Sequence, residues 1–200
     1  MKDNPFNVLT ANSESWLKVG DIMSKNVATI ERASDIVAAA QTMSSRNISC
    51  IVVLDDGAVA GIITETDMLR KTVVRRDDLC QMKVDEMMSY PVRSVSADLS
   101  VRQASETMET EKIRRLVIVD RERPVGIVTQ TDIVQVLASH TLSQKVSDAM
   151  MTDVVVMGSS TCVKEAAELM ASRDISCLVI VDGGAVAGIF TERDFLRRVV

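Results

Sequence analysis

The chain has 200 residues, of which 46% are hydrophobic and 26% charged, as is typical of a soluble globular protein with one or two domains. Its net charge of −5 argues against DNA or RNA as a partner, because a nucleic-acid binder needs a basic face to neutralise phosphates. No apolar run approaches the roughly 20 residues that cross a bilayer, and residues 1–5 lack the apolar core of a signal peptide, so we expect a cytoplasmic protein that does not insert into a membrane.

The sequence contains three copies of one repeat. Each copy includes a glycine, two apolar residues, a threonine and, three positions later, an aspartate; the copies are Gly61–Asp67, Gly126–Asp132 and Gly188–Asp194. Repeats one and three also match without a gap over the preceding residues 46–60 and 173–187. Such internal repetition predicts one supersecondary unit that is used three times.

These matches divide the chain into a tail or extra helix followed by three repeats. Trp16 and Leu17 are expected to pack the tail against repeat one. Repeat three stops within its last helix, so we expect it to lack a partner: either the chain is part of a longer protein, or this repeat pairs across a homodimer. The expected boundaries are 1–18 for the tail and 19–80, 81–141 and 142–200 for the repeats.

Each repeat is expected to begin with a short extended segment and a polar stretch that can cap a helix. The extended segments are Val27–Ile30, Val92–Val95 and Val154–Met157. The polar stretches are Ser34-Asp35, Asp98 to Ser100 and Ser159 to Thr161.

An amphipathic helix and a β-hairpin are expected next. In repeat one, Ile36, Ala39, Ala40 and Met43 have the i, i+3, i+4, i+7 spacing of one helical face. Two apolar strands, Cys50–Leu54 and Ala58–Ile63, are separated by an Asp-Gly turn, which is a strong hairpin signal. Repeat two has Asp120–Pro124 in place of that turn, for which we expect a longer loop. The last helix begins at each Thr-x-x-Asp, which completes a mixed α/β unit of the form β-α-β-β-α.

The corner between strand and last helix has two interpretations. Thr and Asp at this spacing cap a helix, and a cap alone stabilises a fold by about 1 kcal/mol. A helix N-terminus also presents N–H groups and partial positive charge, which can hold a phosphate. The sequence leaves both interpretations open.

Catalytic and metal sites are not expected. There is no P-loop, no Gly-x-Gly-x-x-Gly and no Cys-x-x-Cys, and His140 is the only histidine, so neither an enzyme, a required cofactor nor a zinc site is indicated. The four cysteines are expected to be buried reduced thiols. They are Cys50, Cys80, Cys162 and Cys177.

The three Gly-apolar-apolar-Thr-x-x-Asp motifs resemble CBS domains, the cystathionine-β-synthase-type modules. Support comes from the Asp-x-Met openings and from Ile-Ser-Cys or Ile-Arg-Arg before the second strand, and the resemblance covers roughly residues 19–200. It implies that repeats one and two pair into a Bateman module. It also implies a regulatory, energy-sensing role in which AMP, ADP, ATP or S-adenosylmethionine binds in clefts between repeats and controls an effector domain or partner.

The resemblance also assigns roles to individual residues. The motif aspartates would accept hydrogen bonds from the ribose hydroxyls, the motif threonines would approach the phosphate, and backbone near the first strand would frame the adenine. The aspartates are Asp67, Asp132 and Asp194, the threonines are Thr64, Thr129 and Thr191, and the adenine segments lie around Val27, Val92 and Val154.

Charge ranks the three sites. A phosphate needs positive charge, and repeat two has Arg114 where the other repeats have Ser49 and Ser176. Repeat two is therefore expected to hold a phosphorylated ligand, whereas the other two suit a less charged ligand or stay empty. The alternative function is a dimerisation scaffold that binds no ligand.

Overall fold

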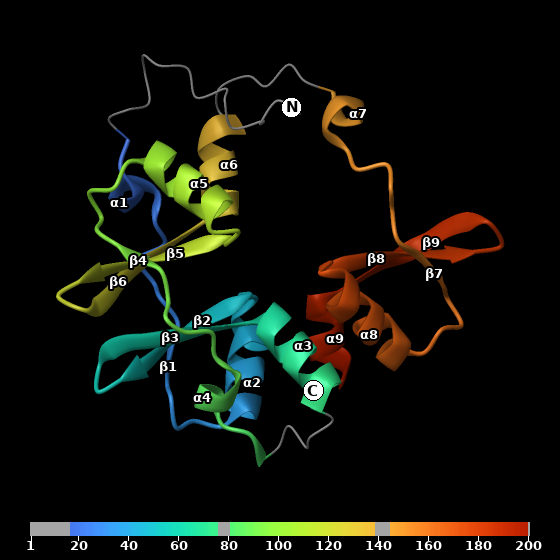
Figure 1. Ribbon diagram of the computed structural model, residues 1–200, viewed down its shortest axis with the longest axis horizontal. Helices are drawn as coiled ribbons and strands as arrows, with labels where there is room; N and C mark the ends of the chain where they lie inside the picture. Colours follow the sequence, from blue (N-terminus) through green and yellow to red (C-terminus); the bar gives the residue numbers. More distant parts are fainter. Residues whose placement is uncertain (1–16, 76–80, 139–144, 200) are drawn as a thin grey trace. The chain divides into compact units, whose positions relative to one another are not determined.

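A computed structural model of the chain describes residues 17–75, 81–138 and 145–199 (Figure 1). Within these residues each repeat has a short helix, a strand, a long helix, a β-hairpin and a last helix. The expected β-α-β-β-α unit is therefore confirmed, with one additional helical turn at its start. None of the helices in the described ranges is long and apolar enough to span a bilayer. Trp16, Cys80, His140 and most of the expected tail lie outside the described residues.

Equivalent elements have similar lengths in the three repeats. The short helices are α1 (Val19–Ile22), α4 (Val84–Met87) and α7 (Val146–Ala149). The first strands are β1 (Thr29–Glu31), β4 (Ser94–Val95) and β7 (Val156–Gly158), and the long helices are α2 (Ile36–Arg46), α5 (Val101–Thr110) and α8 (Val163–Arg173). The hairpins are β2–β3 (Cys50–Asp55, Ala58–Thr64), β5–β6 (Arg115–Asp120, Arg123–Thr129) and β8–β9 (Cys177–Asp182, Ala185–Thr191), and the last helices are α3 (Glu65–Arg75), α6 (Gln130–Ala138) and α9 (Glu192–Val199).

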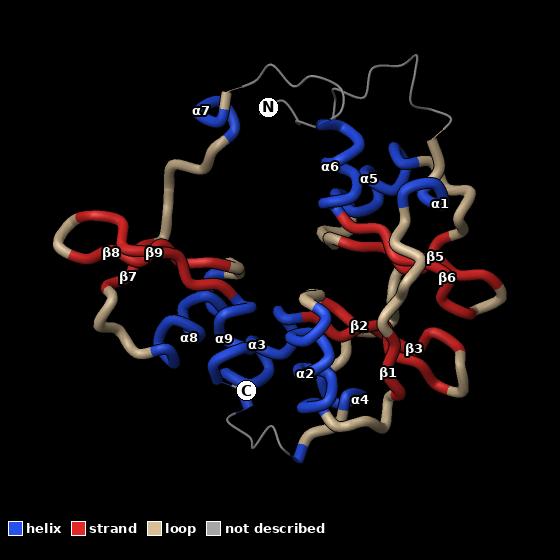
Figure 2. The backbone as a smooth tube through the Cα atoms, turned by 180° about the vertical axis from the view of Figure 1, so that it is seen from behind, coloured by secondary structure: helices blue, strands red, loops and turns tan. Residues whose placement is uncertain are grey.

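Each repeat forms a three-stranded sheet within the described residues, with its first strand parallel to the first hairpin strand (Figure 2). The first strands begin two residues later than expected. Val27, Val92 and Val154 therefore precede β1, β4 and β7 rather than beginning them.

All three hairpins turn through two residues, so the longer loop expected in repeat two is wrong. Arg121 and Glu122 occupy its turn with φ of 45° and 66°, and Asp56 and Gly57 have the same signs in repeat one. Positive φ at both central residues matches the twist of the flanking strands, as in a type I′ turn. Pro124 lies within edge strand β6, next to a register shift, where its missing N–H disturbs the ladder least.

The long helices bury the faces that their spacing indicated. Ile36, Ala39, Ala40 and Met43 are all buried on α2, as expected. The caps differ between repeats: the hydroxyl of Ser100 accepts a hydrogen bond from the N–H of Gln103, as a capping box requires. In repeat three the cap is Cys162, one residue beyond the expected polar stretch.

The described chain divides into two compact units, each with its own contacts. The first unit contains residues 17–28, the hairpin tip Asp56–Val59 and residues 91–138 of repeat two. The second contains Thr29–Asp55, Ala60–Tyr90 and repeat three from Val146. The short helix of repeat one thus belongs with repeat two, and that of repeat two with repeat one.

In the first unit, the leading segment of repeat one completes the core of repeat two. Val19 is buried together with Val101, Leu116 and Val128, and Leu17 packs against this cluster, which contains residues of both repeats. Ser24 then pairs with Ile127 on the edge of β6 through two backbone hydrogen bonds of 2.9 and 3.1 Å.

The second unit contains the reciprocal arrangement. Ser89 pairs with Ile62 on the edge of β3 through backbone bonds of 2.8 and 3.1 Å, and Val84 is fully buried. Lys71 of α3 donates to the carbonyls of Met87 and Met88 at the end of α4. Figures 1 and 2 both show α4 beside α2.

A methionine packed against the motif glycine makes that glycine a packing requirement in two repeats. A Cβ at Gly126 would overlap the Sδ atom of Met23, and a Cβ at Gly61 would lie 2.7 Å from Sδ of Met88 and 3.0 Å from the carbonyl of Ser89. At Gly188 no described atom lies within 4 Å of such a Cβ.

We therefore expect Gly126→Ala to destabilise the protein by about 1–3 kcal/mol, because the extra methyl group overpacks the contact with Met23. Gly188→Ala is the matched control and should change stability by less than about 0.5 kcal/mol. Urea denaturation in dilute solution measures both, and equal effects of the two substitutions would contradict the packing role of Gly126.

Candidate functional site

Each strand-to-helix corner is closed by a reciprocal hydrogen-bond pattern between its threonine and its aspartate. In repeat two the carboxylate oxygen Oδ2 of Asp132 accepts the N–H and the hydroxyl of Thr129, both at 2.7 Å. The N–H of Asp132 donates in return to the threonine hydroxyl at 3.4 Å. Thr64 with Asp67, and Thr191 with Asp194, form the same three bonds at 2.6–3.3 Å. The capping interpretation is thus satisfied in all three repeats.

In the first turn of each last helix, fewer backbone N–H groups are available to a ligand than in an uncapped helix, because some already donate hydrogen bonds within the protein. The N–H of Gln130 donates to the carbonyl of Arg114 at 3.0 Å, in addition to the bond from Asp132 to the threonine. Glu65 and Glu192 donate in the same way to the carbonyls of Ser49 and Ser176. A phosphate at these corners therefore depends on side-chain donors more than on the helix terminus itself.

The second carboxylate oxygen distinguishes repeat one from repeat two. In repeat one, Oδ1 of Asp67 accepts the hydroxyl of Ser89 at 2.7 Å. In the described part of the chain, the hydrogen bonds that the carboxylate of Asp132 accepts all go to Oδ2. Asp132 therefore keeps an acceptor oxygen at a half-buried position, which a ligand hydroxyl can use.

In repeat two the residues expected from the sequence meet at one end of the sheet. Thr129 is paired directly with Arg115 across the hairpin, and the preceding residue, Arg114, contacts the start of α6 through its carbonyl. Because Ser94 is level with Val117 on parallel strands, Val92 is level with Arg115. Val92, Arg114 and the corner thus lie together.

Repeat three has the same layout. Thr191 pairs with Cys177, and the register of β7 on β8 places Val154 level with the same cysteine. In repeat one, Val27 belongs to the first compact unit and Thr64 to the second.

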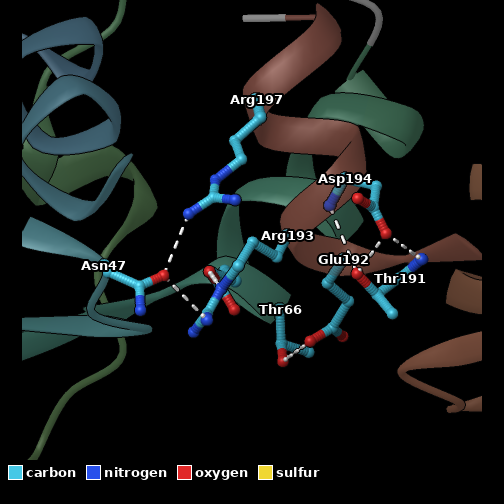
Figure 3. Close-up of polar contacts among 8 residues, drawn as sticks. Asn47, Thr66, Thr191, Glu192, Arg193, Asp194 and Arg197 are labelled. Carbon is cyan, nitrogen blue, oxygen red and sulfur yellow. Dashed lines mark hydrogen bonds and ion pairs between the residues drawn. The ribbon is translucent and has the colours of Figure 1, made fainter. Parts of the chain in front are cut away.

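The two residues inside the Thr-x-x-Asp motif, which had no expected role, join repeats one and three (Figure 3). Arg193 donates through Nε to Glu65 Oε1 at 2.9 Å, and Thr66 donates to Glu192 Oε2 at 2.9 Å. The first variable position of each motif is thus bonded to the second variable position of the other. Glu192 is buried, so the bond from Thr66 satisfies a carboxylate removed from water.

Asn47, at the end of α2, extends this contact. Its side-chain oxygen accepts from Arg193 at 3.2 Å and from Arg197 at 2.9 Å, as Figure 3 shows. Arg193 and Arg197 are four residues apart, and so lie on one face of α9. The spacing of the two arginines is present in the sequence. Their partner cannot be read from it, because Asn47 belongs to another repeat and comes close only when the chain folds.

The exposure of the described cysteines differs from the expectation in repeat three. Cys162 and Cys177 are exposed and Cys50 is half-buried, so the expectation of burial is wrong for the two cysteines of repeat three. The sulfur of Cys162 accepts the N–H of Glu165 at the start of α8. Among the described residues, no three His, Cys, Asp or Glu side chains are grouped as a metal site requires.

Comparison with known proteins identifies one family throughout. A family model described as the CBS domain matches residues 19–73, 84–139 and 146–200. The uncharacterised protein MJ1225 of Methanocaldococcus jannaschii is 28% identical over 194 residues, which cover 90% of this chain and 69% of that protein. The CBS domain-containing protein YhcV of Bacillus subtilis is 35% identical over 137 residues, which cover 68% of this chain and 94% of YhcV.

Two solved structures have the same fold. The crystal structure of MJ1225, proposed as an archaeal homologue of g-AMPK, has a TM-score of 0.81 at 23% identity and covers 90% of this chain and 72% of its own. The CBS domain pair of protein MJ0100 was solved in complex with 5′-methylthioadenosine and S-adenosyl-L-methionine. It has a TM-score of 0.57 at 28% identity and covers 62% of this chain and 98% of its own.

The pair Glu65–Arg193 should be energetically coupled, because the carboxylate of Glu65 is only 12% exposed and loses its charged partner when Arg193 is removed. Arg193→Ala is expected to cost about 1–2 kcal/mol, and a double-mutant cycle with Glu65→Ala should give a coupling of about 1 kcal/mol in urea denaturation. Arg102→Ala removes an exposed pair with Glu106 and should cost less than about 0.5 kcal/mol. Additive losses for Glu65 and Arg193 would contradict the coupling.

Proposed function

The chain belongs to the CBS domain family, and on that premise we propose that it is a regulatory module that binds an adenosine-containing ligand and controls an effector domain or partner protein. The ligand is a signal rather than a cofactor, and the module acts by binding rather than by catalysis. The effector lies in a longer polypeptide or in a separate cytoplasmic protein.

The corner of repeat two is the observation that supports this proposal most strongly. A ribose presents two neighbouring hydroxyl groups, which a carboxylate accepts well. Asp132 has an acceptor oxygen that no described protein group uses, and it is held in place by its two bonds from Thr129. A preorganised acceptor of this kind binds without further loss of side-chain freedom.

The remaining parts of a nucleotide fit the neighbouring residues. Val92, half-buried beside β5, is assigned to the adenine, and Arg114 with Thr129 to the phosphate. Because the hydroxyl of Thr129 already donates to Asp132, the charge for the phosphate comes from Arg114. The relative MJ0100, crystallised with two adenosine derivatives, supports the ligand class.

Repeats one and three are assigned to less charged adenosine ligands. Their corners, Thr64 with Asp67 and Thr191 with Asp194, have Ser49 and Ser176 in place of the arginine. Val27 and Val154 are the corresponding adenine positions. In repeat one a ligand has to compete with the hydroxyl of Ser89 for Asp67, which lowers the affinity expected there.

The contact between motifs offers a route for regulation. Glu65 and Thr66 lie inside the first motif, and both are bonded to the third motif through Arg193 and Glu192. A ligand that moves Asp67 therefore acts, through Glu65 and Thr66, on residues next to Asp194. A ligand that moves Asp194 acts on the first corner through the same two bonds. Coupling between two such sites is typically about 1–3 kcal/mol.

A dimerisation scaffold without a ligand remains the second candidate. It is favoured by the complete caps, because Thr and Asp at each corner stabilise a helix whether or not a ligand binds. Thermal shift separates the two candidates: a ligand at 100 times its Kd stabilises the protein by about 2.7 kcal/mol. If AMP, ADP, ATP, S-adenosylmethionine and NADH all leave the melting temperature unchanged, the sensing proposal fails for these ligands.

Asp132→Asn separates the cap from the ligand site. The amide oxygen can still accept both bonds from Thr129, so the unliganded protein should lose less than about 0.5 kcal/mol, whereas the amide nitrogen cannot accept a ribose hydroxyl. We expect the Kd of the best ligand to rise at least about tenfold by calorimetry. Asp67→Asn is the matched control and should leave that Kd unchanged. An unchanged Kd in Asp132→Asn would assign the corner of repeat two to capping alone.

Arg114→Ala tests the phosphate assignment. It should weaken AMP by about tenfold and leave adenosine unaffected, because only AMP carries the charge that the guanidinium neutralises. Arg121 is an exposed arginine in the turn at the opposite end of the same hairpin, so Arg121→Ala should affect neither ligand. Equal losses for AMP and adenosine in Arg114→Ala would place the arginine outside the phosphate site.

A further inference from the structure

The corners of repeats one and two differ in how many hydrogen bonds their aspartates already accept. Oδ2 of Asp67 accepts the N–H and the hydroxyl of Thr64 at 2.9 and 2.6 Å, and its Oδ1 accepts the hydroxyl of Ser89 at 2.7 Å. Oδ2 of Asp132 accepts the same two bonds from Thr129, and no described protein group donates to its Oδ1. The two carboxylates have the same role in the helix cap and differ by one accepted hydroxyl.

The backbone does not explain this difference, because Ser89 and its counterpart Ser24 are attached alike. Ser89 pairs with Ile62 on the edge of β3, and Ser24 pairs with Ile127 on the edge of β6, each through two backbone hydrogen bonds. The methionine before each serine packs against a motif glycine. Among the described residues, however, only Ser89 donates its hydroxyl to the aspartate of the neighbouring corner.

A lysine fixes the segment that carries Ser89. Lys71 lies one helical turn after Asp67 on α3, and its ammonium group donates to the carbonyl oxygen of Met88, the residue before the serine, at 3.2 Å. Repeat two has Val136 at the position of the lysine, and a valine side chain cannot donate a hydrogen bond. The serine of repeat two is thus tied to the same helix as the aspartate of repeat one, which keeps its hydroxyl within reach of that carboxylate.

The number of bonds that an oxygen can accept limits what each corner can offer to a sugar. A carboxylate oxygen has about two lone pairs for hydrogen bonds. Oδ1 of Asp132 can therefore accept both neighbouring hydroxyl groups of a ribose. Oδ1 of Asp67 already accepts one hydroxyl and can accept one more. Ser89 is exposed to solvent, so this bond lies at the surface, where a ligand can reach it.

We propose that Ser89 determines which sugar the corner of repeat one accepts. With the serine hydroxyl in place, Asp67 accepts one ligand hydroxyl, and repeat one binds ribose and deoxyribose nucleosides almost equally. The corner of repeat two accepts both hydroxyls at Asp132 and selects ribose. This inference rests on the proposed adenosine site and adds the sugar selectivity of each corner. The two corners then respond to different sets of nucleosides.

The size of the effect follows from a single hydrogen bond. A hydroxyl that donates to a carboxylate changes a binding constant by roughly tenfold or more. Loss of the 2′-hydroxyl should therefore cost repeat two about tenfold in affinity. At repeat one the remaining hydroxyl still has its acceptor, so the loss should be less than about threefold.

Single-site variants of the full chain test this selectivity by calorimetry with adenosine and 2′-deoxyadenosine. Asp132→Asn with Asp194→Asn leaves the aspartate of repeat one, and Asp67→Asn with Asp194→Asn leaves that of repeat two. The asparagine oxygen keeps each helix cap. The Kd for 2′-deoxyadenosine divided by the Kd for adenosine should be at least about ten in the repeat-two protein and less than about three in the repeat-one protein. Equal ratios in the two proteins would overturn the proposal.

Ser89→Ala in the repeat-one protein separates the serine from the rest of the corner. It should raise the affinity for adenosine about tenfold and leave that for 2′-deoxyadenosine nearly unchanged, which gives repeat one the ratio of repeat two. Ser89→Thr keeps a hydroxyl and should keep the native ratio. Ser24→Ala in the repeat-two protein is the matched control and should leave its ratio unchanged. An unchanged ratio in Ser89→Ala, including equal gains for both nucleosides from the smaller side chain, overturns the proposal.

The same measurements separate this inference from the proposed function. If neither single-site protein binds adenosine, the proposed site fails and the inference fails with it. Binding by only one of the two proteins overturns the inference, because the inference needs both corners to accept a ribose, but it leaves the adenosine site at the other corner standing.

Discussion

The edge strand of each small sheet needs a covering segment from outside its own repeat, and this requirement governs the structure. In repeats one and two the segment comes from the other repeat, and its methionine packs on a glycine of the edge strand. The glycine of the motif is therefore explained by packing before any ligand is considered. In repeat three the equivalent side chains, Val146 and Ile189, are exposed.

At the corner between strand and helix, the proposed ligand site shares its residues with the helix cap. One carboxylate oxygen of Asp132 accepts both bonds from Thr129, and no described protein group donates to the other, so stabilising the fold also positions an acceptor. The capping and ligand interpretations are therefore compatible rather than exclusive. What separates the three corners is their surroundings: Ser89 bonds to Asp67 in repeat one, and repeat two has Arg114 where the other repeats have serine.

The variable residues of the motif connect corners of different repeats. Glu65 and Arg193 would be ordinary surface charges on isolated helices, where such pairs contribute little. Packing of α3 against α9 brings them together with Thr66 and the buried Glu192. Coupling between two binding sites requires contacts of this kind, because binding at one site changes the affinity at the other only through interactions that depend on both.

The sequence alone determined the fold of the repeat, because periodicity, the capping pattern and the turn signals are local and recur three times. It also determined the corner residues, as Thr129 and Asp132 are three positions apart and need only one helical turn to meet. It did not determine the hairpin of repeat two, where Arg121 and Glu122 adopt positive φ under the constraint of the paired strands. Tertiary structure alone decided the exchange of leading segments and the contact between Glu65 and Arg193. These contacts join residues of different repeats, and no local pattern records which surfaces will be brought together.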